Sequence, residues 1–531
     1  MARSPAPGLR PAEERSSQIA AESESGHDGE PAESPPVGRL STLRQAVLAP
    51  RIESLFAATV VLFGFRLGAR PIGDNSMFTH LRTGIDMART GHIPRTDPYS
   101  FTAGGEPWVV QSWLAELTYG WAYRVGGLRL VVLEQSVLVA MLVWLVLRLA
   151  RAGSPLRTAL AGGTAVCVGA AFWTPRPLLF GLICMALTIL IVERRKSPWL
   201  LVPVLWVWAS THGSFPLGLV WLGARMVGEG IDARAWPKDA WRYVVGFLAG
   251  LAVSVVNPLG LKLLAFPLTL GEKQESFRNI VEWRSPDFSR AGGHFALAAL
   301  ALALILLLRA RIGWRDIVPV VGFLIAGLLA ARNIGVLGVV LAPALGRALR
   351  RPDVDASVVA PADPPPEEEE EEPSPPPPAE APAPALGSRV RINRAILALI
   401  GAAFLVFTAS IYDKPPLDLV GYPEEPMAFL DEEGLLAAPH RLATQDFIGN
   451  YLTLRWPAVP VFVDDRFDMY PLSVSRDYEA LLSGRGSSLE ILDREKIDIV
   501  LWQPKLPLVP LLEARGWRQT YTSDDWVVLQ R

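Results

Sequence analysis

The sequence is poor in cysteine and carries almost no net charge. Only two cysteines, Cys167 and Cys184, occur among its 531 residues, and the formal net charge is -2. Both cysteines lie in apolar stretches, which excludes a disulfide framework and a thiolate metal site. The balanced charge gives no reason to expect nucleic acid as a partner. The first residues also lack the apolar core of a signal peptide.

Apolar residues, by contrast, make up 50% of the chain, and the mean hydropathy is +0.27. They fall in blocks close to the roughly 20 residues that cross a hydrocarbon core of about 30 Å. This pattern predicts about eleven membrane-spanning helices. The expected spans are residues 53–70, 128–148, 158–174, 177–192, 198–212, 214–230, 242–258, 293–309, 316–331, 333–349 and 393–412.

The distribution of basic residues predicts how these spans are oriented. Lysine and arginine concentrate in every second turn, as in Arg194, Arg195 and Lys196. The short turns on the other side are nearly bare, with Arg176 in one and Arg332 in another. By the positive-inside rule the basic turns and the N-terminus are cytoplasmic, and the last span leads the C-terminus out of the cytoplasm.

Composition divides the chain into a membrane part, a linker and a C-terminal part of mixed pattern. The segment after the last span predicts strands at 441–445, 460–465 and 497–502 and a terminal hairpin, with helices between them. The fold class expected is an α-helical polytopic membrane protein with a C-terminal extracytoplasmic α/β domain. The predicted parts are a disordered cytoplasmic tail (1–50), a transmembrane domain (51–349) with a first outer loop (71–127), a Pro/Glu-rich cytoplasmic linker (350–391), a last transmembrane helix (392–412) and the α/β domain (413–531).

The first outer loop contains two predicted helices. Asp74, Asn75 and Ser76 open the first, which ends at Gly91, and the second begins near Ser112. The second helix is rich in tryptophan and tyrosine, residues that favour the headgroup layer of a bilayer. Both helices are therefore expected to lie flat on the membrane surface.

Several short stretches in this loop and beyond it resemble a known group of proteins. With them, the chain resembles a bacterial, largely uncharacterised branch of the GT-C superfamily of membrane glycosyltransferases, which includes the protein O-mannosyltransferases and the lipid A aminoarabinose transferases. The stretches are an acid just after the first span (Asp74), HLRTG (80–84), IPRTDPYSFT (93–102), PWVVQSWLAE (107–116), THGSFPLG (211–218), NPLG (257–260), EWRSPDF (282–288), AARN (330–333) and VFVDDRFDMY (461–470).

The resemblance implies an enzyme of the bacterial cytoplasmic membrane that moves a sugar from a polyprenyl-phosphate carrier to an extracytoplasmic glycan, lipid or protein. Such a transfer needs a carboxylate to take the proton of the acceptor hydroxyl and cations to hold the departing phosphate. Asp74 matches the first-loop acid of the family and is the candidate base, with Asp97 as a second catalytic acid. The substrate-binding candidates are His80, Arg82, Arg95, His212 and Glu282.

Each candidate also has a structural interpretation. An aspartate at position 74 would cap a helix, and Asp97 before Pro98 would start a turn. Arg82 and Arg95 would instead bind lipid headgroups or pair with carboxylates. Because Asn75 stands where many GT-C enzymes carry a second acid, no metal ligand is assigned, and a role for Mg²⁺ or Mn²⁺ stays open. The carboxylates of VFVDDRFDMY fit either a cation site or, more commonly, an ion-paired turn around Arg466.

Two alternatives to the glycosyltransferase are also compatible with the sequence. The first is a non-catalytic envelope protein, in which a GT-C-like frame serves as a scaffold and the C-terminal domain binds a partner. The second is a lipid or solute transporter, which predicts charged residues along a central path and an internal repeat. No repeat is evident, and most charges in the spans lie near their ends.

Overall fold

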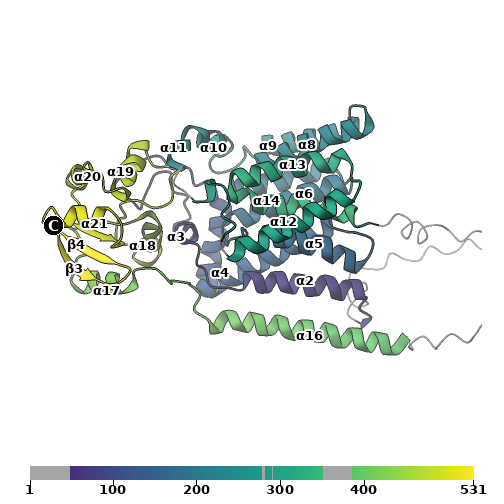
Figure 1. The fold of residues 1–531 in the computed structure, drawn as a ribbon, viewed down its shortest axis with the longest axis horizontal. Coiled ribbons are helices and arrows are strands. Elements are labelled where there is room, and N and C mark those ends of the chain that lie inside the picture. Colours follow the sequence, from purple (N-terminus) through teal and green to yellow (C-terminus); the bar gives the residue numbers. More distant parts are fainter. Residues whose placement is uncertain (1–47, 278–280, 290, 351–385) are drawn as a thin grey trace, which may run out of the picture.

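The protein consists of a long helical bundle and a smaller domain with a sheet at one end of it (Figure 1). The computed structural model describes residues 48–277, 281–289, 291–350 and 386–531. The predicted tail (1–50) and the Pro/Glu-rich linker (350–391) lie almost entirely outside the described residues. Helices α2 and α16 begin at the end of the bundle that faces away from the sheet domain.

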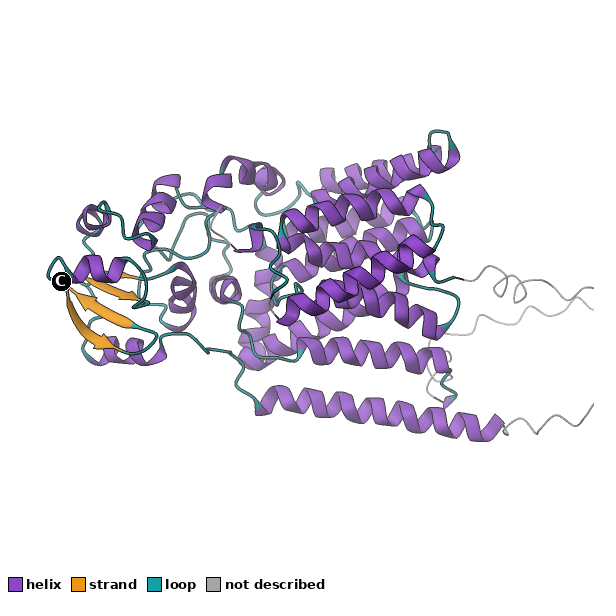
Figure 2. Cartoon of the chain, viewed as in Figure 1, coloured by secondary structure: helices purple, strands orange, loops and turns teal. Residues whose placement is uncertain are grey.

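A helix covers each of the eleven apolar segments predicted from the sequence, and these helices run side by side in the bundle (Figure 2). Most bounds differ from the predicted ones by a few residues, because capping residues and turns set where a helix ends. The helix over 128–148 is the exception, since it begins at Trp113, 15 positions before the predicted start. The helices are α2 (Ile52–Gly68), α4 (Trp113–Leu149), α5 (Pro155–Ala170), α6 (Leu178–Glu193), α7 (Leu201–Thr211, after the 3-10 turn η1, Pro198–Leu200), α8 (Pro216–Ala233), α9 (Lys238–Val253), α12 (Ala291–Arg309), α13 (Trp314–Leu329), α14 (Ile334–Ala348) and α16 (Leu386–Asp413).

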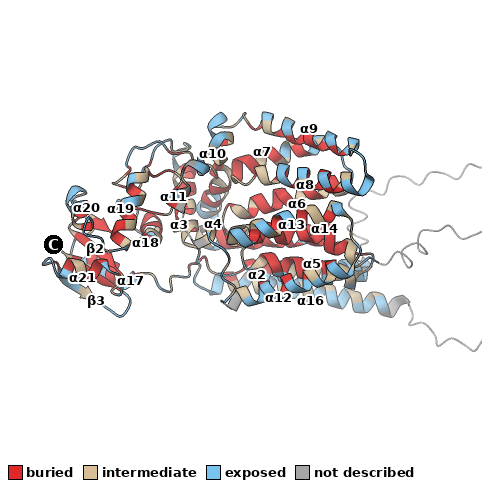
Figure 3. Cartoon of the chain, turned by 45° about the horizontal axis from the view of Figure 1, so that its top comes forward, coloured by how far each residue is buried: buried red, intermediate tan, exposed pale blue. Residues whose placement is uncertain are grey.

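The outer surface of the bundle is apolar. Large apolar side chains are exposed on several helices, including Phe63, Trp144, Phe295, Leu308 and Leu405, whereas α14 is buried at the centre (Figure 3). Among the described helices, two segments, Trp113–Leu149 and Arg389–Asp413, are long and apolar enough to span a membrane by length and composition. A continuous apolar surface of this kind fits lipid better than water.

The first outer loop holds helix α3 (Asn75–Thr90), which lies against α4 and against the sheet domain. Met77, Phe78 and Leu81 are fully buried there. Gly84 and Gly120 form the crossing of α3 and α4, where a Cβ on either glycine would stand 1.9 Å from a backbone oxygen of the other helix. The apolar face of α3 therefore packs on protein, and the expectation that this helix lies flat on the membrane stays a prediction. Helix α4 kinks at Gly126 and Gly127, which separates its loop portion from its long apolar portion.

Short elements complete this end of the bundle. They lie between the long helices and the sheet domain, where they supply side chains to the site described below. They are α10 (Leu261–Glu272), α11 (Gln274–Phe277), η2 (Val281–Trp283) and η3 (Ala331–Asn333).

The C-terminal domain is a four-stranded sheet with helices around it. The strand order is β1-β2-β4-β3, with β1 parallel to β2 and the other pairs antiparallel. The predicted terminal hairpin is confirmed by the pairing of β3 with β4. The elements are α17 (Glu424–Glu432), β1 (Leu442–Ala443), α18 (Asp446–Arg455), α19 (Leu472–Leu482), α20 (Ser488–Arg494), β2 (Ile499–Trp502), α21 (Leu508–Glu513), β3 (Arg518–Thr522) and β4 (Val527–Gln530).

The predicted strand at 460–465 is wrong, and its backbone joins the first outer loop instead. The Phe101 N–H donates to the Val461 carbonyl at 3.0 Å, and the Val461 N–H donates to the Tyr99 carbonyl at 3.0 Å. The segment is extended and apolar, which explains the strand pattern, but its hydrogen-bond partners lie outside the sheet. These bonds attach the C-terminal domain to the loop on which the sequence places its candidate residues.

Candidate functional site

A cavity of about 430 Å³ lies where the bundle meets the C-terminal domain. Helix α3, the turns before α6 and after α7, helix α10, the turns η2 and η3, and the C-terminal domain all contribute to its wall. Most stretches that carry the GT-C resemblance supply a lining residue. The ionisable residues of the lining are His80, Arg176, His212, Glu282, Arg332, Asp446, Asp465 and Asp468.

Arg176 is the best-connected cation of the cavity. Its Nε lies 2.6 Å from Oδ2 of Asp74, and its Nη1 lies 2.5 Å from Oε1 of Glu282. Burial opposes the charge of Arg176, but the two carboxylates raise its pKa above the ordinary value. The arginine therefore keeps its charge and a fixed position in the cavity wall. In the sequence, Arg176 is notable only as a basic residue in a short outer turn, where basic residues are otherwise rare.

Arg332 is a second cation, held in a different way. Its guanidinium lies 4.5 Å from the centre of the Trp283 ring, and no carboxylate among the described residues lies within ion-pair distance of it. Burial lowers the pKa of Arg332, and nearby Glu282 opposes that effect. A half-buried cation without an ion-pair partner favours binding of an anion from outside the chain.

Asp74 lies beside the cavity wall, with both carboxylate oxygens engaged. Oδ1 accepts a 3.1 Å hydrogen bond from the Ser76 N–H and so caps α3, as the structural interpretation expects. Oδ2 accepts from Arg176. A carboxylate with these two partners is well placed to orient Arg176. Its assignment as the base stays a prediction.

The other predicted loop residues do not line the cavity. Asp97 is buried in its own turn, where it accepts from the N–H groups of Tyr99 (3.0 Å) and Ser100 (3.1 Å) and pairs with Arg466 at 2.8 Å. Arg82 forms a two-pronged pair with Asp86 at 2.8 and 2.9 Å. Arg95 is exposed and donates to the Pro258 carbonyl at 2.5 Å. In each case, nearer protein groups satisfy the side chain.

Both predicted histidines line the cavity. The Nδ1 of His80 lies 2.7 Å from Oε1 of the buried Glu116, and although burial lowers the pKa of His80, this bond raises it overall. The Nδ1 of His212 lies 2.8 Å from the Ser214 hydroxyl. The site therefore holds one histidine paired with a carboxylate and one bonded to a hydroxyl.

Arg466 connects the first loop to the C-terminal domain through ion pairs. Its Nη2 lies 2.8 Å from Oδ1 of Asp97 and 2.6 Å from Oδ2 of Asp464. Its guanidinium also lies 4.5 Å from the centre of the Trp108 ring. Arg466 and Asp464 thus form the ion-paired turn that the sequence offered as an alternative. This turn fixes the residues that follow Val463 at the cavity wall.

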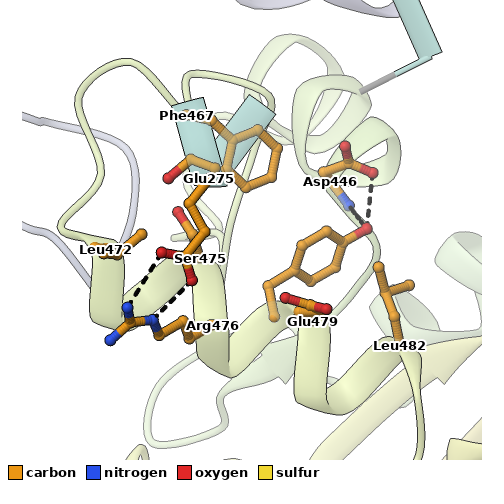
Figure 4. Close-up of a pocket in the computed structure, with 10 residues that line it drawn as sticks. Glu275, Asp446, Phe467, Leu472, Ser475, Arg476, Glu479 and Leu482 are labelled. Atoms are coloured by element: carbon orange, nitrogen blue, oxygen red, sulfur yellow. Dashed lines mark hydrogen bonds and ion pairs between the residues drawn. The ribbon is translucent and has the colours of Figure 1, made fainter. Parts of the chain in front are cut away.

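A smaller hollow of about 120 Å³ adjoins the cavity at Asp446 (Figure 4). It lies between α11 and α19, and the Glu275–Arg476 ion pair stands at its edge. The Tyr478 hydroxyl donates to Asp446 at 2.8 Å. Burial raises the pKa of Asp446, and the bond from Tyr478 opposes that effect. Asp446 is therefore engaged at the boundary between the two hollows.

Comparison with known proteins finds two similar solved structures, both of ArnT from Cupriavidus metallidurans. The apo structure shares 13% sequence identity and a TM-score of 0.48, over 90% of this chain and 96% of that one. The structure bound to undecaprenyl phosphate shares 12% identity and a TM-score of 0.46, over 89% and 96%. No family model matches the chain, and no curated protein matches it.

Several cavity residues were not among the sequence candidates. Arg176 and Arg332 looked like isolated charges in short turns, and Asp465 and Asp468 looked like part of an ion-paired turn. The available signal was their position, because each lies in an outer turn or in a stretch that carries the GT-C resemblance. Among the described residues, no group of three or more histidine, cysteine or acidic side chains is placed to hold a metal ion.

Proposed function

We propose that this protein transfers a sugar from a polyprenyl-phosphate carrier to an acceptor outside the cytoplasm. The observation that carries the proposal is Arg332, a cation without an ion-pair partner among the described residues, in the same cavity as Arg176. The cavity opens at the end of an apolar bundle, where a lipid phosphate would arrive with its chain in the membrane. A polyprenyl phosphate combines these two chemistries, an apolar chain and an anionic head.

In this proposal the two arginines bind the phosphate and stabilise the charge that develops on it as the sugar leaves. Arg176 is held by Asp74 and Glu282, so it needs little reorganisation when the phosphate arrives. Arg332 gains an anionic partner. His212 and the amide of Gln111, whose Nε2 is buried without a hydrogen-bond partner among the described residues, offer polar contacts to the sugar.

The proposed orientation follows from the two ends of the bundle. The turns rich in arginine and lysine join helices at the end away from the cavity, as between α6 and α7 and between α12 and α13. The positive-inside rule would make that end cytoplasmic and the cavity extracytoplasmic. Reporter fusions at residue 531 and in the turn at 194–197 would test this, and a cytoplasmic C-terminus would contradict it.

Replacing Arg332 tests the phosphate site. Arg332→Ala should weaken the binding of undecaprenyl phosphate by about 10- to 100-fold, because a charge-assisted contact of about 1.5–3 kcal/mol is lost. Binding is measured on the purified full chain in nanodiscs, by displacement of a fluorescent polyprenyl phosphate. The matched control is Arg95→Ala, an arginine outside the cavity that donates to a backbone carbonyl, and it should change binding by less than about 2-fold.

A comparison of surface glycans, combined with the lipid-binding assay, distinguishes the enzyme from a non-catalytic scaffold. A scaffold is favoured by the full engagement of Asp74 and the burial of Asp97, the two acids expected to be catalytic. Comparison of surface glycans between the wild type and a deletion strain decides between them. Loss of one sugar in the deletion strain supports the transferase, whereas an unchanged glycan profile together with unchanged lipid binding in Arg332→Ala contradicts it.

A further inference from the structure

Asp465 brings a carboxylate from the C-terminal domain into the cavity. It lines both the main cavity and an adjoining hollow of about 100 Å³ that reaches His80 and Glu116. It follows directly after Asp464, which is fully buried and paired with Arg466. Asp464 is therefore held in the ion-paired turn, whereas the next residue, Asp465, lines the cavity.

Asp465 lies in a loop, and contacts from helices α18 and α3 fix its position. Its backbone N–H donates to Oδ1 of Asn450 on α18 at 3.2 Å, and the same oxygen accepts from Thr79 of α3 at 2.7 Å. The Ser76 hydroxyl donates to Oδ2 of Asp465. The remaining oxygen, Oδ1, has no hydrogen-bond or ion-pair partner among the described residues. One oxygen thus anchors the carboxylate of this lining residue, and the other has no partner among the described residues.

The electrostatic surroundings of Asp465 suit proton transfer near neutral pH. Burial is the largest influence and raises the pKa of this carboxyl to about 6, against the lowering effects of Ser76, Arg176 and His80. A carboxylate with a pKa near 6 is ionised at neutral pH and still basic enough to accept a proton in a transition state. Asp465 and Arg176, a cation of the proposed phosphate site, both line the cavity.

We propose that Asp465 is the general base of the transfer, so that the C-terminal domain completes the active site. The proposal rests on the proposed function. Asp465 accepts the proton of the acceptor hydroxyl while the acceptor oxygen forms a bond to C1 of the sugar. The bond between C1 and the phosphate oxygen breaks, and its electron pair leaves on the polyprenyl phosphate held by Arg176 and Arg332.

The other acids of the region are less suited to this role. Asp74 caps α3 with one oxygen and holds Arg176 with the other. Glu282 pairs with Arg176, and Asp446 accepts from Tyr478. Asp468 also lines the cavity, but no hydrogen bond or ion pair from another described residue holds its carboxylate. Burial raises the pKa of Asp468, and Arg466 and Lys273 oppose that effect. Asp465 is anchored by the Ser76 hydroxyl through one oxygen, keeps the other unengaged among the described residues, and lines the same cavity as Arg176 and Arg332.

The test uses the full chain in two assays, with Asp465→Asn as the main variant. The deletion strain carrying Asp465→Asn should make its surface glycan at least about 100-fold more slowly than the strain carrying the wild type, because a general base contributes about 10²- to 10⁴-fold. Binding of undecaprenyl phosphate in nanodiscs should stay within about 3-fold of wild type, which also shows that the variant is folded. Asp493→Asn, which replaces an exposed acid of the same domain, should match the wild type in both assays.

A pH profile adds a readout that a structural role would not move. Glycan transfer in membrane vesicles should fall below about pH 6 for the wild type, because Asp465 is then protonated. The residual activity of Asp465→Asn should lack this decline, and Asp465→Glu should restore part of the rate. Full transfer by Asp465→Asn, or loss of transfer in Asp468→Asn alone, would overturn the assignment. Failure of the wild type to bind undecaprenyl phosphate better than phosphatidylglycerol would instead overturn the proposed function itself.

Discussion

The two ends of the helical bundle use the same kinds of residues in opposite ways. At the end away from the C-terminal domain, Glu193, Arg225, Asp316 and Arg347 form a closed network in which Arg347 lies 2.7 Å from Glu193 and 2.6 Å from Asp316. At the cavity end, Arg332 has an aromatic ring beneath it but no carboxylate partner, and Asp465 keeps one oxygen unengaged, as far as the described residues show. Charges paired with one another hold helices together, whereas unpaired charges in a cavity are available to a ligand.

Breaking the closed network should have the largest effect on stability. Arg347→Ala leaves Glu193 and Asp316 without their shared partner, and loss of one member of a buried ion pair costs about 3–5 kcal/mol. The prediction is a large drop in the thermal midpoint of the full chain in detergent. Arg350→Ala, at an exposed arginine close by that donates to the Arg151 carbonyl, is the control and should shift it little. Equal shifts for both variants would show that the network is not a stabilising unit.

The cavity end should depend more on close backbone packing than on ion pairs. A Cβ at Gly84 would stand 1.9 Å from the Glu116 carbonyl oxygen, so Gly84→Ala should destabilise the protein by about 1–3 kcal/mol through overpacking of α3 against α4. Thermal unfolding measures this effect. Gly163→Ala is the matched control, because no atom lies within 4 Å of its added Cβ, and there the better helix propensity of alanine should stabilise α5 by about 0.5–1 kcal/mol. The same sign at both glycines would contradict the packing argument.

Asp465, which has one unengaged oxygen, should lower the free energy of unfolding by an amount that depends on pH. Folding raises the pKa of Asp465 from 3.8 to about 6, so the folded state disfavours its ionised form. The resulting loss of stability is absent below about pH 4, where the carboxyl is protonated in both states, and is complete above about pH 6. Asp465→Asn should therefore stabilise the protein by about 1–3 kcal/mol at pH 7.5 and by almost nothing at pH 4.

Unfolding of the wild type and Asp465→Asn across this pH range measures the difference. Asp464→Asn provides the contrast, because that carboxylate is paired with Arg466 at 2.6 Å and its loss should destabilise the protein at neutral pH. If Asp465→Asn destabilised the protein at pH 7.5, Asp465 would belong with the closed pairs of the opposite end. That result would contradict the proposed difference between paired charges at one end of the bundle and unengaged charges at the cavity end.

The helices were predictable because their signal is local. Blocks of apolar residues near the length of a membrane crossing fix where helices lie, and a helix covers most of each predicted span, although α4 begins 15 positions earlier than predicted. The cap at Asp74, the end of α3 at Gly91 and the terminal hairpin follow from equally local rules. The segment at 460–465 shows the limit of such rules, since its apolar pattern predicts a strand but its partners lie in the first outer loop.

The sequence by itself therefore determined the helices, the GT-C resemblance and the loop in which chemistry was expected. Only the tertiary structure decided which side chains share the cavity. Ser76 and Asp465 are 389 positions apart in the chain and yet hydrogen-bonded, and Arg176 joins Asp74 to Glu282 across two loops. Arg82 and Asp97 have partners nearby in the chain, Asp86 four positions along α3 and the N–H groups of the turn after Asp97, whereas Arg95 donates to the distant Pro258 carbonyl. Helix formation depends on neighbours along the chain, whereas the charge available to a ligand depends on partners that folding brings together.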